Sequence, residues 1–337
     1  MASTFGNKIK VSIFGQSHSV AIGVTIDGIP AGMVLDEERL REFMERRAPG
    51  RDKTATTRNE KDEPEFLSGF TLDNENRLVT CGAPISAIIR NEDVKSEDYE
   101  EIKDVPRPGH ADFAAHIKYG GFEDYRGGGH FSGRLTAPLC IAGGISLQVL
   151  DQLGIKITAE IDEIGGQKIA SKEEVEELIE KARLDGDSIG GIVKCTVSGI
   201  HAGVGDPIFD GIENRVSQAV FGIPAVKGIE FGAGFKAAAM KGSENNDAYT
   251  IDESGNIITE TNNAGGIYGG ISIGQDVFFR VAFKPTPSIA KEQKSISYSR
   301  GEEVSISVKG RHDPCIVPRA LPAVEAATAI AILDLIL

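Results

Sequence analysis

Two long apolar segments constrain the fold of this chain more than any other feature. Residues 135–153 and the C-terminal stretch after Pro322 are apolar on most faces of a helix. A surface helix needs cover on one face, whereas a helix that is apolar all round must be covered on every side. The final run, residues 326–337, is too short to span a bilayer and contains Asp334. We therefore expect two helices buried in the core of a soluble protein.

Other apolar residues alternate with polar ones, a pattern typical of strands that bury one face. Strands and helices do not alternate regularly along the chain, which disfavours a doubly wound parallel sheet. No proline- or serine-rich linker and no repeat of ~20–50 residues divides the chain. These observations favour one α+β domain over residues 1–337. The expected strands include residues 9–13, 24–26, 155–161, 193–197, 277–283 and 304–308.

Capping residues predict where three further helices begin. Asp36 is a candidate N-cap, and Ser171 with Glu174 forms a capping-box pattern ahead of apolar residues at helical spacing. The dipeptide Asp206-Pro207 is typical of a helix with proline in its first position. We expect a helix to start at each of these points.

Composition and charge exclude several classes of protein. The 337 residues include 36 Lys+Arg and 50 Asp+Glu, so the formal net charge is −14. Phosphate backbones attract cationic surfaces, which makes bulk nucleic-acid or anionic-membrane binding a poor expectation. The four cysteines form no C-x-x-C pair, and we expect reduced thiols and no metal site. The N-terminal sequence has no signal-peptide pattern, so the expectation is a cytoplasmic protein.

Positive charge is nevertheless concentrated in one segment. Arginine forks match phosphate and carboxylate groups, so this segment either binds a polyanion or is a solvated loop with acids from elsewhere nearby. Its cations are Arg46, Arg47, Arg51, Lys53 and Arg58.

Two histidines lie in glycine-containing turns, where side chains are presented rather than buried. His18 lies in one such turn, at residues 15–18, and His110 lies in a second, at residues 107–112. Histidine is the side chain best suited to proton transfer near neutral pH. We take these two as candidate proton-transfer residues, and His116 and His201, which lack this setting, as structural.

Glycine-rich and proline-rich loops supply further candidates. Residues 127–134 lead directly into the apolar helix, where backbone amides can hold an anion, or where glycines can simply allow a tight turn and close packing. A second glycine loop covers residues 262–270, and residues 284–288 and 311–314 place cations and an acid in proline turns. No P-loop or Rossmann pattern accompanies them. This inventory suits proton removal with departure of an anion such as phosphate.

Five motifs, in the expected order from about residue 6 to the C-terminus, resemble those of the chorismate synthase family. Each would be weak alone, whereas five in register are specific, and they cover nearly the whole chain. The matching stretches are 15–18 with 27–32, 107–112 with 127–137, 263–270, 284–288, and 311–315 with 318–320 and 325–326.

The resemblance implies a fold, a reaction and partners. It implies a β-α-β sandwich with helices packed between two antiparallel sheets, assembled as a homotetramer. It implies an FMN-dependent lyase of the shikimate pathway of aromatic amino-acid biosynthesis, which converts 5-enolpyruvylshikimate-3-phosphate to chorismate and phosphate by anti 1,4-elimination. The FMN must be reduced, although no net redox change occurs; NADPH or a separate flavin reductase would supply the electrons.

The resemblance also implies residue roles. His18 matches the acid that protonates the departing phosphate, and His110 the histidine that keeps reduced flavin suitably protonated. Asp313 matches the acid that assists removal of the proton from C6 of the substrate. The implied substrate ligands are Arg46, Arg47, Lys53, Arg107 and Arg134, and the implied flavin contacts are His130, Phe131, Ser132, Ala225, Gly269, Lys284, Pro285, Thr286, Pro287, Ser288 and Arg311.

Several residues depart from the family pattern. Gln16 replaces a glutamate, which we expect to weaken the pull on the His18 proton; identical pH–rate profiles for the native protein and Gln16→Glu would contradict this. These departures keep open a non-catalytic relative that binds flavin or an anion. Without the resemblance, a flavin-independent sugar-phosphate lyase or isomerase is the alternative. The other departures are Lys53, His130, Phe131, Gly133, Leu135 and Leu139.

Overall fold

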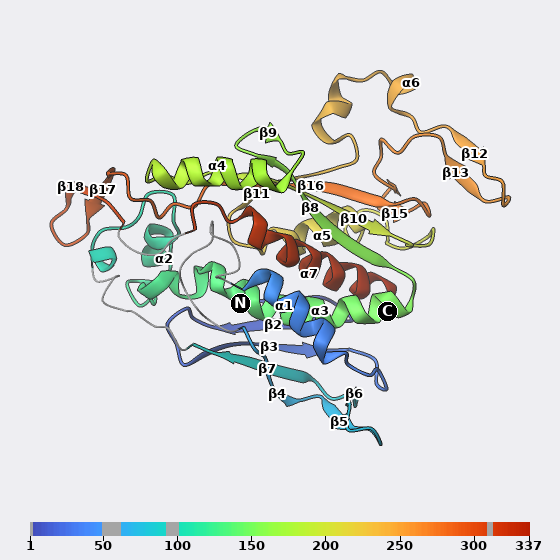
Figure 1. Ribbon diagram of the computed structural model, residues 1–337, viewed down its shortest axis with the longest axis horizontal. Helices are drawn as coiled ribbons and strands as arrows, with labels where there is room; N and C mark the ends of the chain where they lie inside the picture. The colour runs from blue at the N-terminus through green and yellow to red at the C-terminus, as the bar shows by residue number, and fades with distance from the viewer. Residues whose placement is uncertain (1–2, 49–61, 92–100, 309–312) are drawn as a thin grey trace.

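The two apolar helices form the middle of the molecule. The computed structural model describes residues 3–48, 62–91, 101–308 and 313–337. In it, α3 (Thr136–Gln152) and α7 (Val317–Ile336) pack together between two sheets, with α1 (Glu37–Arg47) and α5 (Ile212–Val220) against them (Figure 1). Nearly every residue of α7 up to Asp334 is buried. The prediction of two helices covered on all sides is therefore confirmed.

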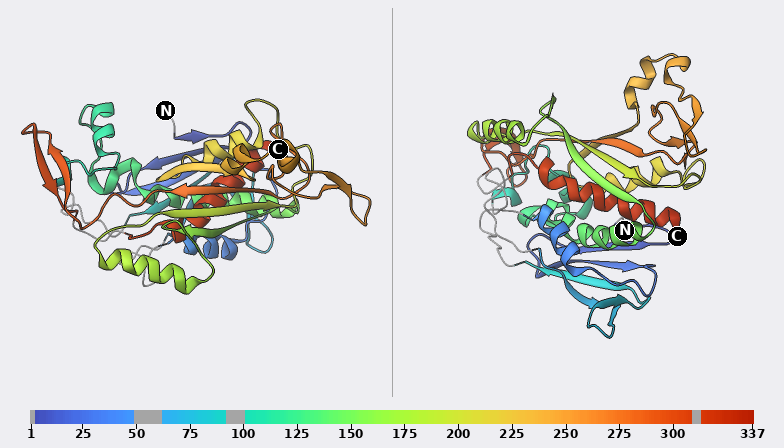
Figure 2. Two further views of the ribbon diagram at one scale, coloured as in Figure 1. Left: turned by 90° about the horizontal axis from the view of Figure 1, so that it is seen from above. Right: turned by 45° about the vertical axis from the view of Figure 1, so that its right-hand side comes forward.

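Two five-stranded antiparallel sheets enclose this helix layer (Figures 1 and 2). One hydrophobic cluster runs through both sheets and the helices between them. The expected α+β sandwich is confirmed. The first sheet has the order β1 (Thr4–Phe5), β2 (Lys10–Gly15), β3 (Ala21–Asp27), β7 (Ile85–Arg90), β4 (Glu65–Ser68); the second has the order β11 (Val226–Phe231), β16 (Val277–Phe283), β10 (Gly191–Ser198), β8 (Lys156–Ile164), β9 (Gln167–Lys168).

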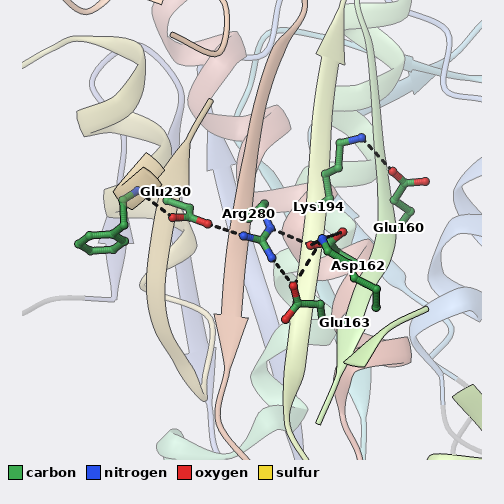
Figure 3. Close-up of polar contacts among 8 residues, drawn as sticks. Glu160, Asp162, Glu163, Lys194, Glu230 and Arg280 are labelled. Carbon is green, nitrogen blue, oxygen red and sulfur yellow. Dashed lines mark hydrogen bonds and ion pairs between the residues drawn. The ribbon is translucent and has the colours of Figure 1, made fainter. Parts of the chain in front are cut away.

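The second sheet shows why its strands alternate in sequence. Val193, Cys195 and Val197 of β10 are fully buried against the helix layer. On the outer face, Arg280 of β16 forms hydrogen bonds to Asp162 at 2.7 Å and to Glu230 at 2.6 Å (Figure 3). One face is thus apolar and the other carries a network of ion pairs in water, as expected for an antiparallel sheet covered on one side.

Smaller elements surround this core. The helical elements among them are η2 (Glu101–Lys103), α2 (Asp112–Tyr119), η3 (Arg126–Phe131), η4 (Gly133–Leu135), α4 (Lys172–Leu184), η5 (Gly234–Ala239) and α6 (Gly242–Asn245). The strand pairs are β5 (Phe70–Leu72) with β6 (Leu78–Thr80), β12 (Tyr249–Ile251) with β13 (Ile257–Thr259), β14 (Ile267–Tyr268) with β15 (Ile271–Ser272), and β17 (Gln293–Ser297) with β18 (Glu302–Ile306).

Two of the three predicted helix starts are confirmed. The Asp36 carboxylate accepts a hydrogen bond from the Arg39 amide at 3.0 Å, and α1 follows. Ser171 accepts from the Glu174 amide at 3.3 Å at the start of α4.

The prediction of a helix beginning at Asp206-Pro207 is wrong. Ile208 has φ of 71°, so the chain turns away from helical geometry directly after the proline. Helix α5 begins at Ile212, with Gly211 as its extended N-cap. The C-terminal helix also starts earlier than expected, at Val317 rather than after Pro322.

Among the residues that the structure describes, one helical stretch, Arg126–Gln152, is long and apolar enough to cross a membrane by length and composition. However, 78% of its most apolar window is buried inside the protein. Its hydrophobicity is therefore accounted for by the core between the two sheets.

Candidate active site

A cavity of about 680 Å³ opens beside the N-terminal ends of α3 and α7. Loops from distant parts of the chain line it, and most of them are those that the motifs indicated. Its lining includes the predicted residues Arg47, Arg107, His110, His130, Phe131, Ser132, Arg134, Ala225, Lys284, Thr286, Pro287, Ser288 and Asp313.

The glycine loop of η3 packs against His18. Gly127, Gly128 and Gly129 all have positive φ, between 52° and 80°. A Cβ on Gly127 would lie 2.3 Å from Cε1 of His18, and one on Gly129 would lie 2.1 Å from the Asp124 carbonyl oxygen. These glycines are therefore required for a tight turn and close packing, and the loop holds the buried His18 ring beside the cavity-lining Gly127.

His110 belongs to a cluster with the buried Arg107 and with Asp112, in which His110 and Asp112 are half-buried. Its Nδ1 lies 2.5 Å from Oδ1 of Asp112, and Arg107 donates to Oδ2 of the same carboxylate at 2.8 Å. Burial opposes ionisation of Asp112, yet hydrogen bonds from Arg107 and His110 hold its pKa well below the usual range. Burial lowers the pKa of His110, the Asp112 hydrogen bond opposes this, and the charge of Arg107 adds to the lowering. The imidazole is therefore neutral at neutral pH.

Asp313 pairs with Arg319, a cavity residue that is absent from the predicted ligands. Arg319 Nη1 donates to Asp313 Oδ2, and its Nε donates to the Arg47 carbonyl oxygen at 3.1 Å. Burial lowers the pKa of Arg319, and the Asp313 charge opposes that shift. The sequence placed Arg319 within a matching motif, but its direct contact with Asp313 depends on the first turn of α7.

Two substrate-ligand candidates, Arg47 and Arg134, meet at a third acid. Both guanidinium groups donate to the buried carboxylate of Asp62. Asp62 comes from a run of charged residues that shows no distinguishing pattern in the sequence. No motif pointed to it, because its role depends on the fold.

The cavity wall also carries lysine and hydroxyl groups. Lys284 Nζ donates to the Gly109 carbonyl oxygen at 2.6 Å, and Ser288 Oγ accepts from Arg107 at 3.1 Å. Burial lowers the pKa of Lys284, and the charge of Lys227, which also lines the cavity, lowers it further. Two lysines near each other make this region favourable for an anion.

Other predicted residues lie elsewhere. Arg46 points to the buried Glu325 of α7, with hydrogen bonds of 2.7 and 2.9 Å, and is not part of the cavity lining. Gly269 lies in the turn between β14 and β15 and is also outside the cavity lining. Pro285 is likewise not part of the lining. Lys53 and Arg311 lie outside the described residues.

Four of the departures from the family pattern fall into two groups. Leu135 and Leu139 pack into the core and are not in the cavity lining. His130 lines the cavity, and its Nδ1 lies 2.8 Å from the Gly15 carbonyl oxygen while its Nε2 lies 2.9 Å from Ser3 Oγ. Phe131 also lines the cavity, with its ring centre 6.3 Å from that of Tyr119.

A cavity wall that combines several arginines with histidine and carboxylate groups is typical of an enzyme site that binds an anion. The chorismate synthase family model matches residues 9–337. Chorismate synthase from Korarchaeum cryptofilum is 45% identical over 98% of this chain and 96% of its own. The Chitinophaga pinensis protein of the same name is 49% identical over 99% and 96%, respectively.

The fold agrees with these sequence similarities. A crystal structure of chorismate synthase superimposes with a TM-score of 0.74 at 25% identity, covering 98% of this chain and 92% of that one. The chain belongs to the chorismate synthase family, and it is an enzyme of the lyase class in the shikimate pathway.

Proposed function

We propose that this protein converts 5-enolpyruvylshikimate-3-phosphate to chorismate and phosphate by anti 1,4-elimination, with reduced FMN. One observation carries the proposal: His110, Asp313 and several arginines line one cavity, and His18 lies against its wall. The substrate class has two carboxylates and a phosphate, which matches a wall of guanidinium groups.

The cavity residues fit a flavin. Lys284 and Ser288 offer a cation and a hydroxyl for a phosphate tail, while Phe131, Ile223 and Pro287 offer apolar walls for a flat ring. Bound reduced FMN would supply an electron-rich ring without net oxidation or reduction. The neutral His110 beside it would accept or return a proton.

The roles of the proton-transfer residues follow from their settings. His18, held by the glycine loop, donates a proton to the departing phosphate, whose developing charge the arginines stabilise. Asp313, oriented by Arg319, assists removal of the proton from C6.

The decisive experiment is anaerobic incubation of the native protein with the substrate and reduced FMN, following chorismate absorbance and released phosphate. We expect both products to form, and kcat to fall by about 10²–10⁴ in His18→Ala. Flavin binding without either product would support the non-catalytic alternative. Phosphate release without flavin would support the flavin-independent lyase.

We also propose a cytoplasmic homotetramer. Burial raises the pKa of Cys140 to about 12 and that of Cys315 to about 11, as expected for inert reduced thiols in the cytoplasm.

Tyr249 and Ile251 on the β12–β13 hairpin are exposed, which supports self-association into the proposed tetramer. Light scattering should give four times the chain mass, and a monomer would contradict the proposal.

A separate assay identifies the source of the electrons that reduce FMN. If the protein reduces its own flavin, aerobic NADPH oxidation should depend on the added FMN and on this protein. If NADPH is not consumed, a separate flavin reductase is required.

A further inference from the structure

Asp62 is a buried carboxylate between two cavity arginines. Its Oδ2 accepts from Arg47 Nη1 and its Oδ1 from Arg134 Nη1. The exposed fraction of the side chain is 1% for Asp62, 4% for Arg47 and 3% for Arg134. Burial opposes ionisation of Asp62, yet the charges and hydrogen bonds of the two arginines keep its pKa below the usual value. The carboxylate is therefore ionised at neutral pH.

The two arginines come from separate elements. Arg47 is the last residue of α1, and Arg134 lies in η4, just before α3. Arg47 is also fixed by a 3.0 Å hydrogen bond from its Nε to Thr136 Oγ1. Two neighbouring guanidinium groups would repel each other in a buried site, and an acid that bonds to both removes that repulsion.

We propose that Asp62 is a positioning residue for anion binding, whose carboxylate holds the guanidinium groups of Arg47 and Arg134 together at the cavity wall. Both arginines line the cavity, whereas Asp62 is not part of its lining and acts through them. The identity of the bound substrate rests on the function proposed above. The role of Asp62 in binding a phosphate group does not.

Asp62→Asn distinguishes a positioning role from a role in charge balance alone, because the two roles predict opposite changes in anion affinity. Removing a negative charge next to two cations should tighten anion binding if charge alone matters. If Asp62 orients the guanidinium groups, their directed hydrogen bonds are lost, and binding should weaken by about tenfold or more.

The experiment measures inorganic phosphate binding by calorimetry, and kcat and KM for the substrate, in the native protein and in Asp62→Asn. We expect weaker phosphate binding and a KM that rises more than kcat falls. We also expect Asp62→Asn to have a smaller effect in an Arg47→Met background than in the native protein. Unchanged or tighter phosphate binding would overturn the proposal. So would an Asp62→Asn effect of the same size in the Arg47→Met background as in the native protein.

A matched control removes another buried acid that pairs with an arginine. Asp334 is buried and bonded to Arg215, away from the cavity lining. Asp334→Asn should lower stability but leave phosphate affinity unchanged.

If Asp62→Asn does not fold, Asp62→Glu keeps the charge and moves it by one methylene. Native phosphate affinity in that variant would overturn the proposal. If the native protein binds phosphate but forms no chorismate, the proposed function fails while the phosphate measurement still tests Asp62.

Discussion

At the scale of single residues, the cavity arginines are held by acids of the chain itself. Arg107 bonds to Asp112, and Arg319 bonds to Asp313, as Asp62 bonds to its two arginines. Side chains already held in place lose little freedom when a ligand binds, so a site of this kind is organised before its substrate arrives. The acids thus support anion binding, although they reduce the net positive charge.

Asp112→Asn should impair the proton transfer that we propose for His110. The carboxylate holds the Nδ1 side of the imidazole, and its charge raises the histidine pKa against the effects of burial and Arg107. Without it the His110 pKa falls further, so the acidic limb of the pH–rate profile should move to lower pH, and kcat should fall at least tenfold. The measurement is chorismate formation between about pH 5 and 9. Asp185→Asn, at an exposed ion pair with Lys291, is the control; equal profiles for native and Asp112→Asn proteins would contradict this role.

At the scale of elements, a close contact between α3 and α7 sets the position of the cavity. A Cβ on Gly143 of α3 would lie 2.1 Å from the Cβ of Ala326 on α7. Both helices begin at the cavity wall, where Arg134 precedes α3 and Arg319 lies in the first turn of α7. Their separation therefore determines the distance between the two cavity arginines, Arg134 and Arg319.

Gly143→Ala should push the two helices apart. We expect a loss of about 1–3 kcal/mol in the free energy of unfolding, because the core has no room for the added methyl group. KM should rise as well, since the cavity walls move. Gly242→Ala, at a position where a Cβ meets nothing within 4 Å, should change neither quantity. Native stability for Gly143→Ala, measured by urea unfolding, would contradict this account.

At the scale of the whole molecule, the C-terminal helix fixes the N-terminal segment. Asp334 accepts backbone hydrogen bonds from Asn7, Lys8 and Ile9 at 2.7–3.1 Å, and pairs with Arg215. Burial opposes its ionisation, but these donors keep its pKa below the usual value. One acid thus joins α7, α5 and the start of the first sheet.

Asp334→Asn should lower the free energy of unfolding by about 3–5 kcal/mol, because Arg215 is left without its buried partner. Since the pKa of Asp334 is lower in the folded state, its contribution is complete above the unfolded value near 4 and is lost as the pH falls. The difference in stability between native and variant proteins should therefore shrink below about pH 4. Urea unfolding at several pH values tests this, and a difference that stays constant would contradict it.

Local patterns in the sequence were sufficient for most elements of the core. The alternating residues of β10 and the all-round apolar character of α3 report burial directly, because the periods of strand and helix place each side chain. The start of α5 could not be read in this way. The proline pattern at Asp206-Pro207 is local, but the backbone at Ile208 turns out of helical geometry, and the helix begins at Ile212.

The sequence by itself determined the buried helix layer, the one-faced strands and the motif segments that line the cavity. The helices and strands follow from composition and spacing, and so from interactions between near neighbours along the chain. The motif segments were matched through their resemblance to the chorismate synthase family. The tertiary structure decided which charges meet: it pairs Arg46 with Glu325 away from the cavity, and places Asp62 between two cavity arginines. Such pairings join residues far apart in the chain, and only the packing of α1, α3 and α7 between the sheets brings them within bonding distance.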